Sequence, residues 1–387
     1  MNEFIKLYNQ IEEKEFNKIP FNERTLFIPH FLKDYNVGKI NCEEELCFNV
    51  EREHQGRAKK IINILCNNFN EKELENIKFI NNKISSNQSS WHYKVVPSSS
   101  LFMHIYQQRL INKFFPNAKN ILEIGPGCGY LSVLLASEGR TIFSTDIYQP
   151  HYIFQNYIYK TCSNLNELTK ETKFKLEKDY INHIPWWKFK NLKGNEFQVD
   201  LVIMNHMIAE MNPNSLKRLL NFLVNLKNVS HPPIFCESTG ATIYNSWDDT
   251  TKVLESFNYK KEFSGGSNKE TAKTYIFKKN NSKIRNNNNN SNNIIKRILN
   301  ILPFQREIIK FLKYIQAEIV QFILKITLIK RQQSNLKSFL FFNSKSKFNY
   351  DEIMQVYDKN NWNRESLDEQ FSKKLSPNNK TTMIRNF

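Results

Sequence analysis

The chain has 387 residues, of which 40% are hydrophobic and 13% are aromatic. This composition supports a buried core and excludes wholesale disorder, and the length predicts one large domain with substantial additions. The formal net charge is +17. Most of the basic excess lies beyond residue 280, so the charge does not favour nucleic-acid binding by the rest of the chain.

The cysteines and the apolar runs of the sequence indicate the cellular compartment in which the protein is expected. The six cysteines have neither CxxC spacing nor His companions at zinc spacing, so we expect reduced thiols and no metal site. The N-terminus has no apolar core of signal-peptide length, and the chain has no uncharged apolar run of about 18 residues. The sequence therefore predicts a cytoplasmic protein.

The first part of the chain, residues 1–99, is expected to be mainly helical. Apolar side chains recur at helical spacing over residues 57–69. A serine at one of positions 98–100 can cap a further helix that ends near Phe115, because serine accepts hydrogen bonds from the first backbone N–H groups of a helix. We therefore treat residues 1–99 as a helical extension.

Residues 100–280 alternate strand and helix signals in the way that is typical of a doubly wound α/β domain. Asn212 and Pro213 fit the N-cap and first position of one helix. The last two strands flank a Gly-Gly turn, which predicts an antiparallel hairpin. The fold class is therefore a Rossmann-like, seven-stranded doubly wound sheet with a C-terminal antiparallel hairpin. The expected strands are 121–124, 141–146, 174–177, 200–204, 234–237, 259–263 and 274–278, and the expected helices are 130–138, 149–161, 213–227 and 246–257.

The end of the chain divides into two segments. Residues 281–293 are rich in Asn and too polar to pack, which predicts a linker. Residues 294–387 form a basic, mainly helical extension, with apolar side chains in alternating steps of four and three between Ile308 and Ile329. This stripe, within residues 294–333, can pair two subunits into a homo-oligomer, pack on the α/β domain or lie on an anionic membrane surface.

A glycine-rich turn follows the first strand of the α/β domain. Glu123, Gly125, Gly127 and Gly129 form the pattern ExGxGxG, in which glycines allow unusual dihedral angles and let a ligand approach the backbone. In the NAD-binding pattern GxGxxG the third glycine falls one residue later, at Tyr130. The spacing therefore favours S-adenosylmethionine, a sulfonium cofactor without a pyrophosphate, over NAD.

An acid is expected where the second strand ends, because a carboxylate there can accept hydrogen bonds from the ribose hydroxyls of the cofactor. Asp146 occupies that position. With the glycine turn, it makes residues 100–280 resemble the class I S-adenosylmethionine-dependent methyltransferases. The resemblance implies that Glu123 lies near the methionyl amino group, that Gly125–Gly129 line the cofactor and that Asp146 binds the ribose. It also implies that Asp179 lies near the adenine amino group.

The end of the fourth strand is where the acceptor of the methyl group is expected, because ligands bind outside the carboxyl ends of parallel strands. Asn205, counted among the cofactor contacts, is followed by His206 and not by Pro-Pro, which counts against methylation of exocyclic amines. His206 is the candidate base for an acceptor hydroxyl, with Glu210 four residues later as the candidate that orients the imidazole. No cluster of carboxylates requires a metal.

Three functions are compatible with these residues. The region before the domain, including Trp91, His92 and Tyr93, can supply an acceptor lid, and the arrangement resembles sugar O-methyltransferases. This favours O-methylation of a saccharide or another small hydroxylated acceptor. The alternatives are an RNA or protein methyltransferase that the basic tail recruits, and a noncatalytic scaffold that retains the fold. The intact glycines and Asp146 count against the scaffold, and nucleic acid is not the favoured partner.

Overall fold

The computed structural model describes residues 1–28, 38–43, 45–46, 70–87, 100–170, 175–196, 198–208, 210–226, 231–238, 247–265 and 273–280. Several expectations lie outside these residues. They are the helix at 57–69, the aromatic group of Trp91, His92 and Tyr93, and the linker and basic extension within 281–387. The α/β domain falls mostly within the described part.

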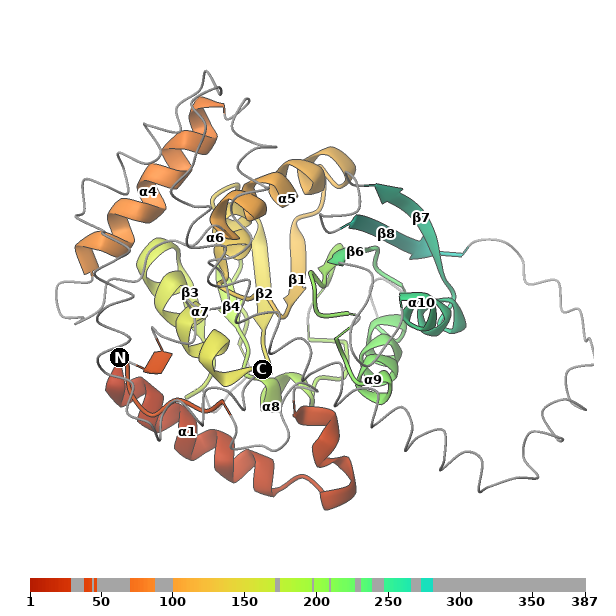
Figure 1. Cartoon of the computed structure of the whole chain (residues 1–387), viewed down its shortest axis with the longest axis horizontal. Helices are drawn as coiled ribbons and strands as arrows, with labels where there is room; N and C mark the ends of the chain where they lie inside the picture. The colour runs from red at the N-terminus through yellow and green to blue at the C-terminus, as the bar shows by residue number, and fades with distance from the viewer. Residues whose placement is uncertain are drawn as a thin grey trace, which may run out of the picture.

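One mixed sheet forms the centre of the described part. Its strands are β1 (Asn120–Ile124), β2 (Thr141–Thr145), β3 (Leu165–Glu167), β4 (Ile181–His183), β5 (Leu201–Ile203), β6 (Ile234–Ser238), β7 (Tyr259–Gly265) and β8 (Lys273–Lys279). They lie in the order β3-β4-β2-β1-β5-β6-β8-β7, and every pair is parallel except the two that involve β8. β1 is central in this order, with β2, β4 and β3 on one side and β5, β6, β8 and β7 on the other (Figure 1). The predicted doubly wound fold with a C-terminal hairpin is confirmed.

The strand beside β2 lies later in the chain than expected. The prediction of a strand at 174–177 is wrong for its described residues 175–177, which are not in a strand, and β4 follows them instead. β4 contains Asn182 and His183, so it shows no apolar run although all three of its residues are buried. β3 adds an unexpected eighth strand at the sheet edge, also without an apolar run.

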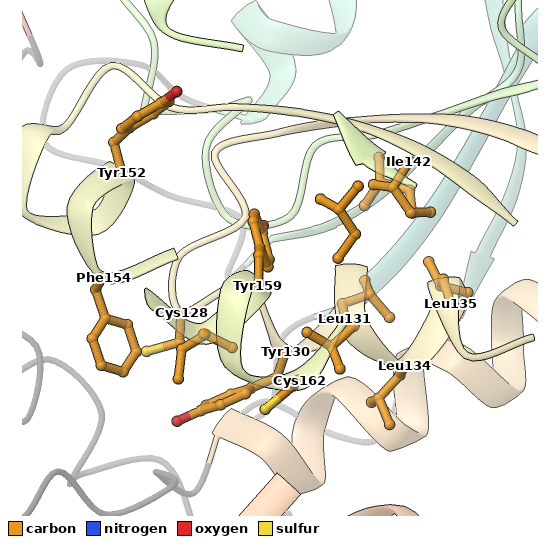
Figure 2. Packing of buried hydrophobic residues seen from close by; sticks show 14 of the residues in the cluster. Cys128, Tyr130, Leu131, Leu134, Leu135, Ile142, Tyr152, Phe154, Tyr159 and Cys162 are labelled. Atoms are coloured by element: carbon orange, nitrogen blue, oxygen red, sulfur yellow. The ribbon is translucent and has the colours of Figure 1, made fainter. Parts of the chain in front are cut away.

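Helices cover both faces of the sheet. α5 (Ser100–Phe114), α6 (Tyr130–Ala136) and α7 (Gln149–Cys162) pack on one face, and α9 (Pro213–Val224) and α10 (Trp247–Ser256) pack on the other. Consecutive strand residues point to opposite faces, so Ile121 belongs to the first core and Leu122 to the second. Figure 2 shows part of the first core, where the rings of Tyr130 and Tyr159 lie among aliphatic side chains such as Leu131.

The described parts of residues 1–99 include helices that pack on this domain. These are α1 (Asn2–Asn17), η1 (Phe21–Phe27) and α4 (Glu71–Asn87), and a short helix, α8 (Trp186–Phe189), follows β4. The ring of Tyr8 in α1 lies 4.9 Å from Tyr152 and 5.0 Å from Trp187, measured between ring centroids. Figure 1 shows α1 next to α8 below the lower ends of β1 and β2. None of the helices in the described residues is long and apolar enough to cross a membrane.

Candidate active site

The glycine turn connects the end of β1 to the start of α6. Gly125, Gly127 and Gly129 all have positive φ, at 65°, 59° and 78°. A Cβ atom added to Gly125 would lie 3.1 Å from Cγ of Met207, and one added to Gly129 would lie 2.6 Å from Cε1 of Tyr159. At Gly127 the same atom would meet none of the described residues within 4 Å. Gly125 and Gly129 therefore leave no room for a side chain, because neighbouring side chains pack against them. Gly127 instead faces open space, which a ligand could occupy.

Glu123 precedes this turn and is buried, with 2% of its surface exposed. Its Oε2 accepts a hydrogen bond from the hydroxyl of Ser132 at the first turns of α6. Burial raises the pKa of the Glu123 carboxyl to about 8, the Ser132 bond partly opposes that rise, and the charge of Asp146 adds to it. A positive group placed beside Glu123 would lower that pKa again, which fits a nearby ammonium.

Asp146 follows the last residue of β2 and lies beside the glycine turn. Its Oδ1 accepts a hydrogen bond from the backbone N–H of Tyr148 at 2.9 Å, and its Oδ2 accepts one from Nε2 of Gln155 at 2.8 Å. Nδ1 of His151 lies 3.8 Å from the same Oδ2. The backbone N–H of Gly125 donates to the carbonyl of Thr145 at 2.9 Å. The structure therefore brings the predicted ribose acid and the glycine turn together.

Asp179 is placed elsewhere. It lies in the turn before β4, is exposed, has a φ of 61° and donates its backbone N–H to Oγ1 of Thr141, the first residue of β2. Since β4 and β2 are parallel, Asp179 lies at the amino edge of the sheet, whereas the glycine turn and Asp146 lie at the carboxyl edge. The assignment of Asp179 to the adenine amino group is therefore wrong.

Asn205 lies at the carboxyl edge after β5, where the sequence placed it, but its amide is engaged inside the protein. Oδ1 accepts a hydrogen bond from the backbone N–H of Glu237 at 3.0 Å, and Nδ2 donates to Oε1 of Gln107 at 3.0 Å. These bonds link the ends of β5 and β6 to α5. They give Asn205 a part in holding the loop, and its role as a cofactor contact stays a prediction.

His206 projects from the same loop and is held in a left-handed backbone conformation, with a φ of 58°. Its backbone N–H donates to the carbonyl of Glu237 at 2.7 Å. Its Nε2 lies 3.7 Å from Oε2 of Glu237, and 17% of the side chain is exposed. The backbone thus places the imidazole at the carboxyl edge with Nε2 buried toward Glu237, and the exposed part of the ring is the part that an acceptor can approach.

Glu237 is a residue of this site that was not predicted from the sequence. It is 3% exposed, and its Oε2 accepts a hydrogen bond from Nε2 of Gln107 at 2.6 Å while Oγ1 of Thr274 lies 3.3 Å from its Oε1. Burial, followed by the Glu237 charge, raises the pKa of the nearby Tyr106 phenol. The available signal was an acid at the end of the apolar run Ile-Phe-Cys-Glu, at the same edge as Asp146.

Glu210 was expected to orient the His206 imidazole. The structure gives Glu210 a backbone hydrogen bond to the carbonyl of Met207 at 2.9 Å. The carboxylate that lies 3.7 Å from the imidazole is that of Glu237. The part that Glu210 plays stays a prediction, and Glu237 joins it as a candidate for the same task.

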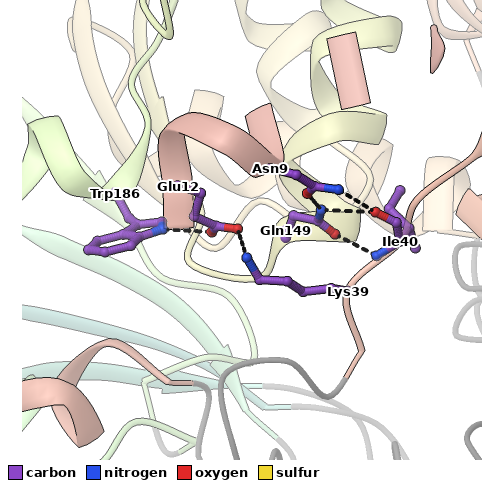
Figure 3. A network of polar contacts seen from close by, with 6 residues as sticks. All are labelled: Asn9, Glu12, Lys39, Ile40, Gln149 and Trp186. Carbon is purple, nitrogen blue, oxygen red and sulfur yellow. Dashed lines mark hydrogen bonds and ion pairs between the residues drawn. The ribbon is translucent and has the colours of Figure 1, made fainter. Parts of the chain in front are cut away.

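The N-terminal region reaches across this edge of the sheet. In Figure 3, Trp186 donates to Oε1 of Glu12 at 2.8 Å and Lys39 donates to Oε2 of Glu12 at 2.7 Å. Asn9 accepts a hydrogen bond from Gln149, the first residue of α7. η1 contacts α9 in a similar way, since Oγ of Ser215 in α9 donates to the carbonyl of Leu26 in η1 at 3.0 Å. α1 and η1 therefore cover the starts of three helices that begin at the carboxyl edge.

The groups around the glycine turn fit S-adenosylmethionine. Among the described residues, Gly127 leaves open space at its Cα, Glu123 lies in β1 before the turn, and Asp146 directly follows β2. Within the described part of the chain, no group of three or more His, Cys, Asp or Glu side chains is arranged to hold a metal ion. The described cysteines are free thiols: Cys42, Cys128, Cys162 and Cys236.

Comparisons with known proteins give likenesses of structure alone. No family model matches the chain, and no curated protein matches it. Among solved structures, an S-adenosylmethionine-dependent methyltransferase of Methanosarcina mazei has 13% identity and a TM-score of 0.33, covering 44% of this chain and 96% of its own. The N-methyltransferase NodS of Bradyrhizobium japonicum has 12% identity and a TM-score of 0.34, covering 53% and 98%. Magnesium protoporphyrin IX methyltransferase of Synechocystis has 12% identity and a TM-score of 0.30, covering 60% and 97%.

Proposed function

We propose that this chain is an S-adenosylmethionine-dependent methyltransferase that methylates a hydroxyl group of a saccharide or another small acceptor. The observation that carries the proposal is the open space at Gly127 beside the Asp146 carboxylate. A cofactor with a ribose and a cationic centre needs backbone that it can approach closely and acids on both sides of that backbone. Glu123 in β1 and Asp146, directly after the adjacent strand β2, supply these acids.

Bound S-adenosylmethionine supplies an electrophilic methyl group on its sulfonium centre. The residues of this chain then have three tasks. The glycine turn and Asp146 hold the nucleoside part, His206 takes the proton from the acceptor hydroxyl as its oxygen attacks, and Glu237 stabilises the imidazolium that results. The last task uses the distance of 3.7 Å between the imidazole and the carboxylate.

The N-terminal region is proposed to close the site. α1 and η1 cover the carboxyl edge, where Trp186 donates to the buried Glu12 of α1 and Ser215 donates to the carbonyl of Leu26 in η1. A cover of this kind excludes water from the methyl group and leaves a limited opening for the acceptor. This favours a small molecule or the end of a glycan over a folded macromolecule.

The test has two steps on the full chain. Calorimetry first measures binding of S-adenosylhomocysteine, and incubation with methyl-labelled cofactor then asks which fraction of the source cells becomes labelled: glycan precursors, RNA or protein. Label in the glycan or small-molecule fraction, lost in His206→Ala while cofactor binding is retained, is the expected result. Binding without label in any fraction would contradict catalysis and favour the scaffold.

A recruited RNA or protein acceptor is the second candidate, because most of the basic excess lies beyond residue 280. Counterion release makes such binding to RNA strongly dependent on salt. Label in RNA or protein, together with salt-sensitive binding that disappears on removal of residues 281–387, would support this candidate. Solution mass with and without residues 294–333 tests the proposed homo-oligomer, and binding to anionic vesicles tests the membrane surface.

A further inference from the structure

Gln155, near the middle of α7, joins three segments of the carboxyl edge. Its Nε2 donates to the carbonyl oxygen of Gly127 at 2.7 Å and to Oδ2 of Asp146 at 2.8 Å. Its Oε1 lies 3.2 Å from Nε2 of His183, the last residue of β4. The side chain is fully buried, so these contacts account for its hydrogen bonds without help from bulk water.

The donors and acceptors around Gln155 fix its chemistry. A carbonyl and a carboxylate only accept hydrogen bonds, so both N–H bonds of the amide must point at Gly127 and Asp146. The amide oxygen then accepts, which places the proton of the imidazole on Nε2 of His183. Burial holds the pKa of the His183 imidazole well below its ordinary value, so the ring stays neutral and this arrangement persists near neutral pH. Two donors and one acceptor on one planar group are what glutamine supplies.

We infer that Gln155 is the positioning residue of the cofactor site, which holds the glycine turn and the ribose acid in one fixed relation. The inference rests on the proposed function, because the relation matters only if one ligand uses both Gly127 and Asp146. The bond from Gly125 to Thr145 ties the two strand ends, but it does not fix the carboxylate of Asp146 relative to the carbonyl of Gly127. Gln155 removes that freedom before any ligand arrives, which lowers the entropic cost of binding.

Other titratable groups surround this contact and enter any experiment that varies pH. By element, they are Glu123 on β1, Asp146 after β2, His183 on β4, and His151 and Tyr159 on α7. The buried phenol and the neutral His183 keep one protonation state through the range used below, because burial raises the pKa of Tyr159 and lowers that of His183. A carboxylate introduced at position 155 would therefore lie in direct contact with the negative charge of Asp146.

The test is titration of the full chain with S-adenosylhomocysteine at about pH 8 and about pH 5.5, in wild type and two variants. Gln155→Glu keeps the side-chain size but turns the donor that faces Asp146 into a second carboxylate. We expect its affinity near pH 8 to fall about 30-fold or more, and at least a fivefold part of that loss to return near pH 5.5, since the protonated acid donates again. Gln155→Met, which cannot donate at either pH, should bind weakly without this recovery.

Asn156→Asp is the matched control. It makes the same amide-to-acid change at the next position of α7, where the side chain is also buried and its Oδ1 makes no hydrogen bond within the described residues. Unfolding temperatures at both pH values separate folding from binding. Wild-type affinity in Gln155→Glu near pH 8, or an equal and pH-independent loss in both acid variants, would overturn the inference. Failure of the wild type to bind would instead refute the methyltransferase proposal.

Discussion

Nε2 of His206, in the loop after β5, lies 3.7 Å from Oε2 of Glu237, near the end of β6. The parallel pairing of β5 with β6 brings those ends together. Gln107 from α5 and Thr274 from β8 then hold the carboxylate. The pairing of the strands thus brings the imidazole and the carboxylate together, and side chains of α5 and β8 hold the carboxylate in place.

Glu237→Gln should reduce methyl transfer by about 10- to 100-fold while the affinity for S-adenosylhomocysteine changes little. Loss of the negative charge makes the protonated imidazole less favourable, so the acid limb of the pH–rate profile should move to lower pH. Glu210→Gln is the matched control, because it tests the other carboxylate proposed to orient His206. Steady-state rates across pH distinguish them, and a loss confined to Glu210→Gln would assign the task to that residue.

Asp146→Ala should weaken binding of S-adenosylhomocysteine by about 10- to 100-fold, because hydrogen bonds to a charged group contribute about 1.5–3 kcal/mol. The fold should remain, as judged by circular dichroism and by the unfolding temperature. Asp179→Ala removes a carboxylate at the opposite edge of the sheet and should bind like the wild type. Calorimetry measures both, and an unchanged affinity in Asp146→Ala would remove the ribose assignment.

Glu123→Gln should change how the free energy of unfolding depends on pH. Burial raises the folded-state pKa of Glu123 to about 8 from an ordinary value of 4.5, so between these values the folded chain holds a proton that the unfolded chain has lost. This group therefore makes stability fall as pH rises, by on the order of 1 kcal/mol per pH unit at most. Urea unfolding at several pH values should show a flatter dependence in the variant. Equal slopes in both proteins would contradict the buried, protonated acid.

Alanine substitutions should distinguish the glycine of the turn that is needed for stability from the one that is needed for cofactor binding. Gly129→Ala should destabilise the fold by about 2–3 kcal/mol or more, because its Cβ would lie 2.6 Å from the Tyr159 ring at a positive φ. Gly127→Ala should cost only about 1–2 kcal/mol for its φ, yet weaken cofactor binding at least tenfold, since its methyl group enters the ligand space. Gly139, which has a φ of 76° and no atom of the described part of the chain within 4 Å of an added Cβ, provides the control: Gly139→Ala should lose stability without losing affinity. Thermal unfolding and calorimetry provide the measurements.

Features that depend on neighbouring residues in the chain were predictable. The side chain of Asn212 accepts a hydrogen bond from the backbone N–H of Asn214 at 2.9 Å, as its position before Pro213 indicated. The glycine turn and Asp146 also followed from local spacing, because a strand that ends in an acid and a turn of glycines are short patterns. Each of these features depends on the properties of a few consecutive residues, so it can be predicted from the sequence.

Features that depend on pairing across the sheet were not predictable in the same way. Asp179 was assigned to the wrong edge because the strand was expected at 174–177, before it, whereas β4 begins after it and, with Asn182 and His183, lacks the apolar run that marks a strand. Glu237 and Gln155 act through partners on other elements, such as Gln107 and His183. No spacing along the chain encodes those distances, since the register of strands and the packing of α5 and α7 create them.

The hydrogen bond from Trp186 to Glu12 has an optical consequence. The indole lies buried at the seam between α1 and the sheet edge, with Trp187 packed edge-on at 5.7 Å. Indole fluorescence shifts in wavelength with the polarity of its surroundings, and here the nearest polar partner belongs to the covering helix. Trp186 is therefore an intrinsic fluorophore at the contact between α1 and α8, and displacement of α1 would be recorded as a change in the wavelength of its emission.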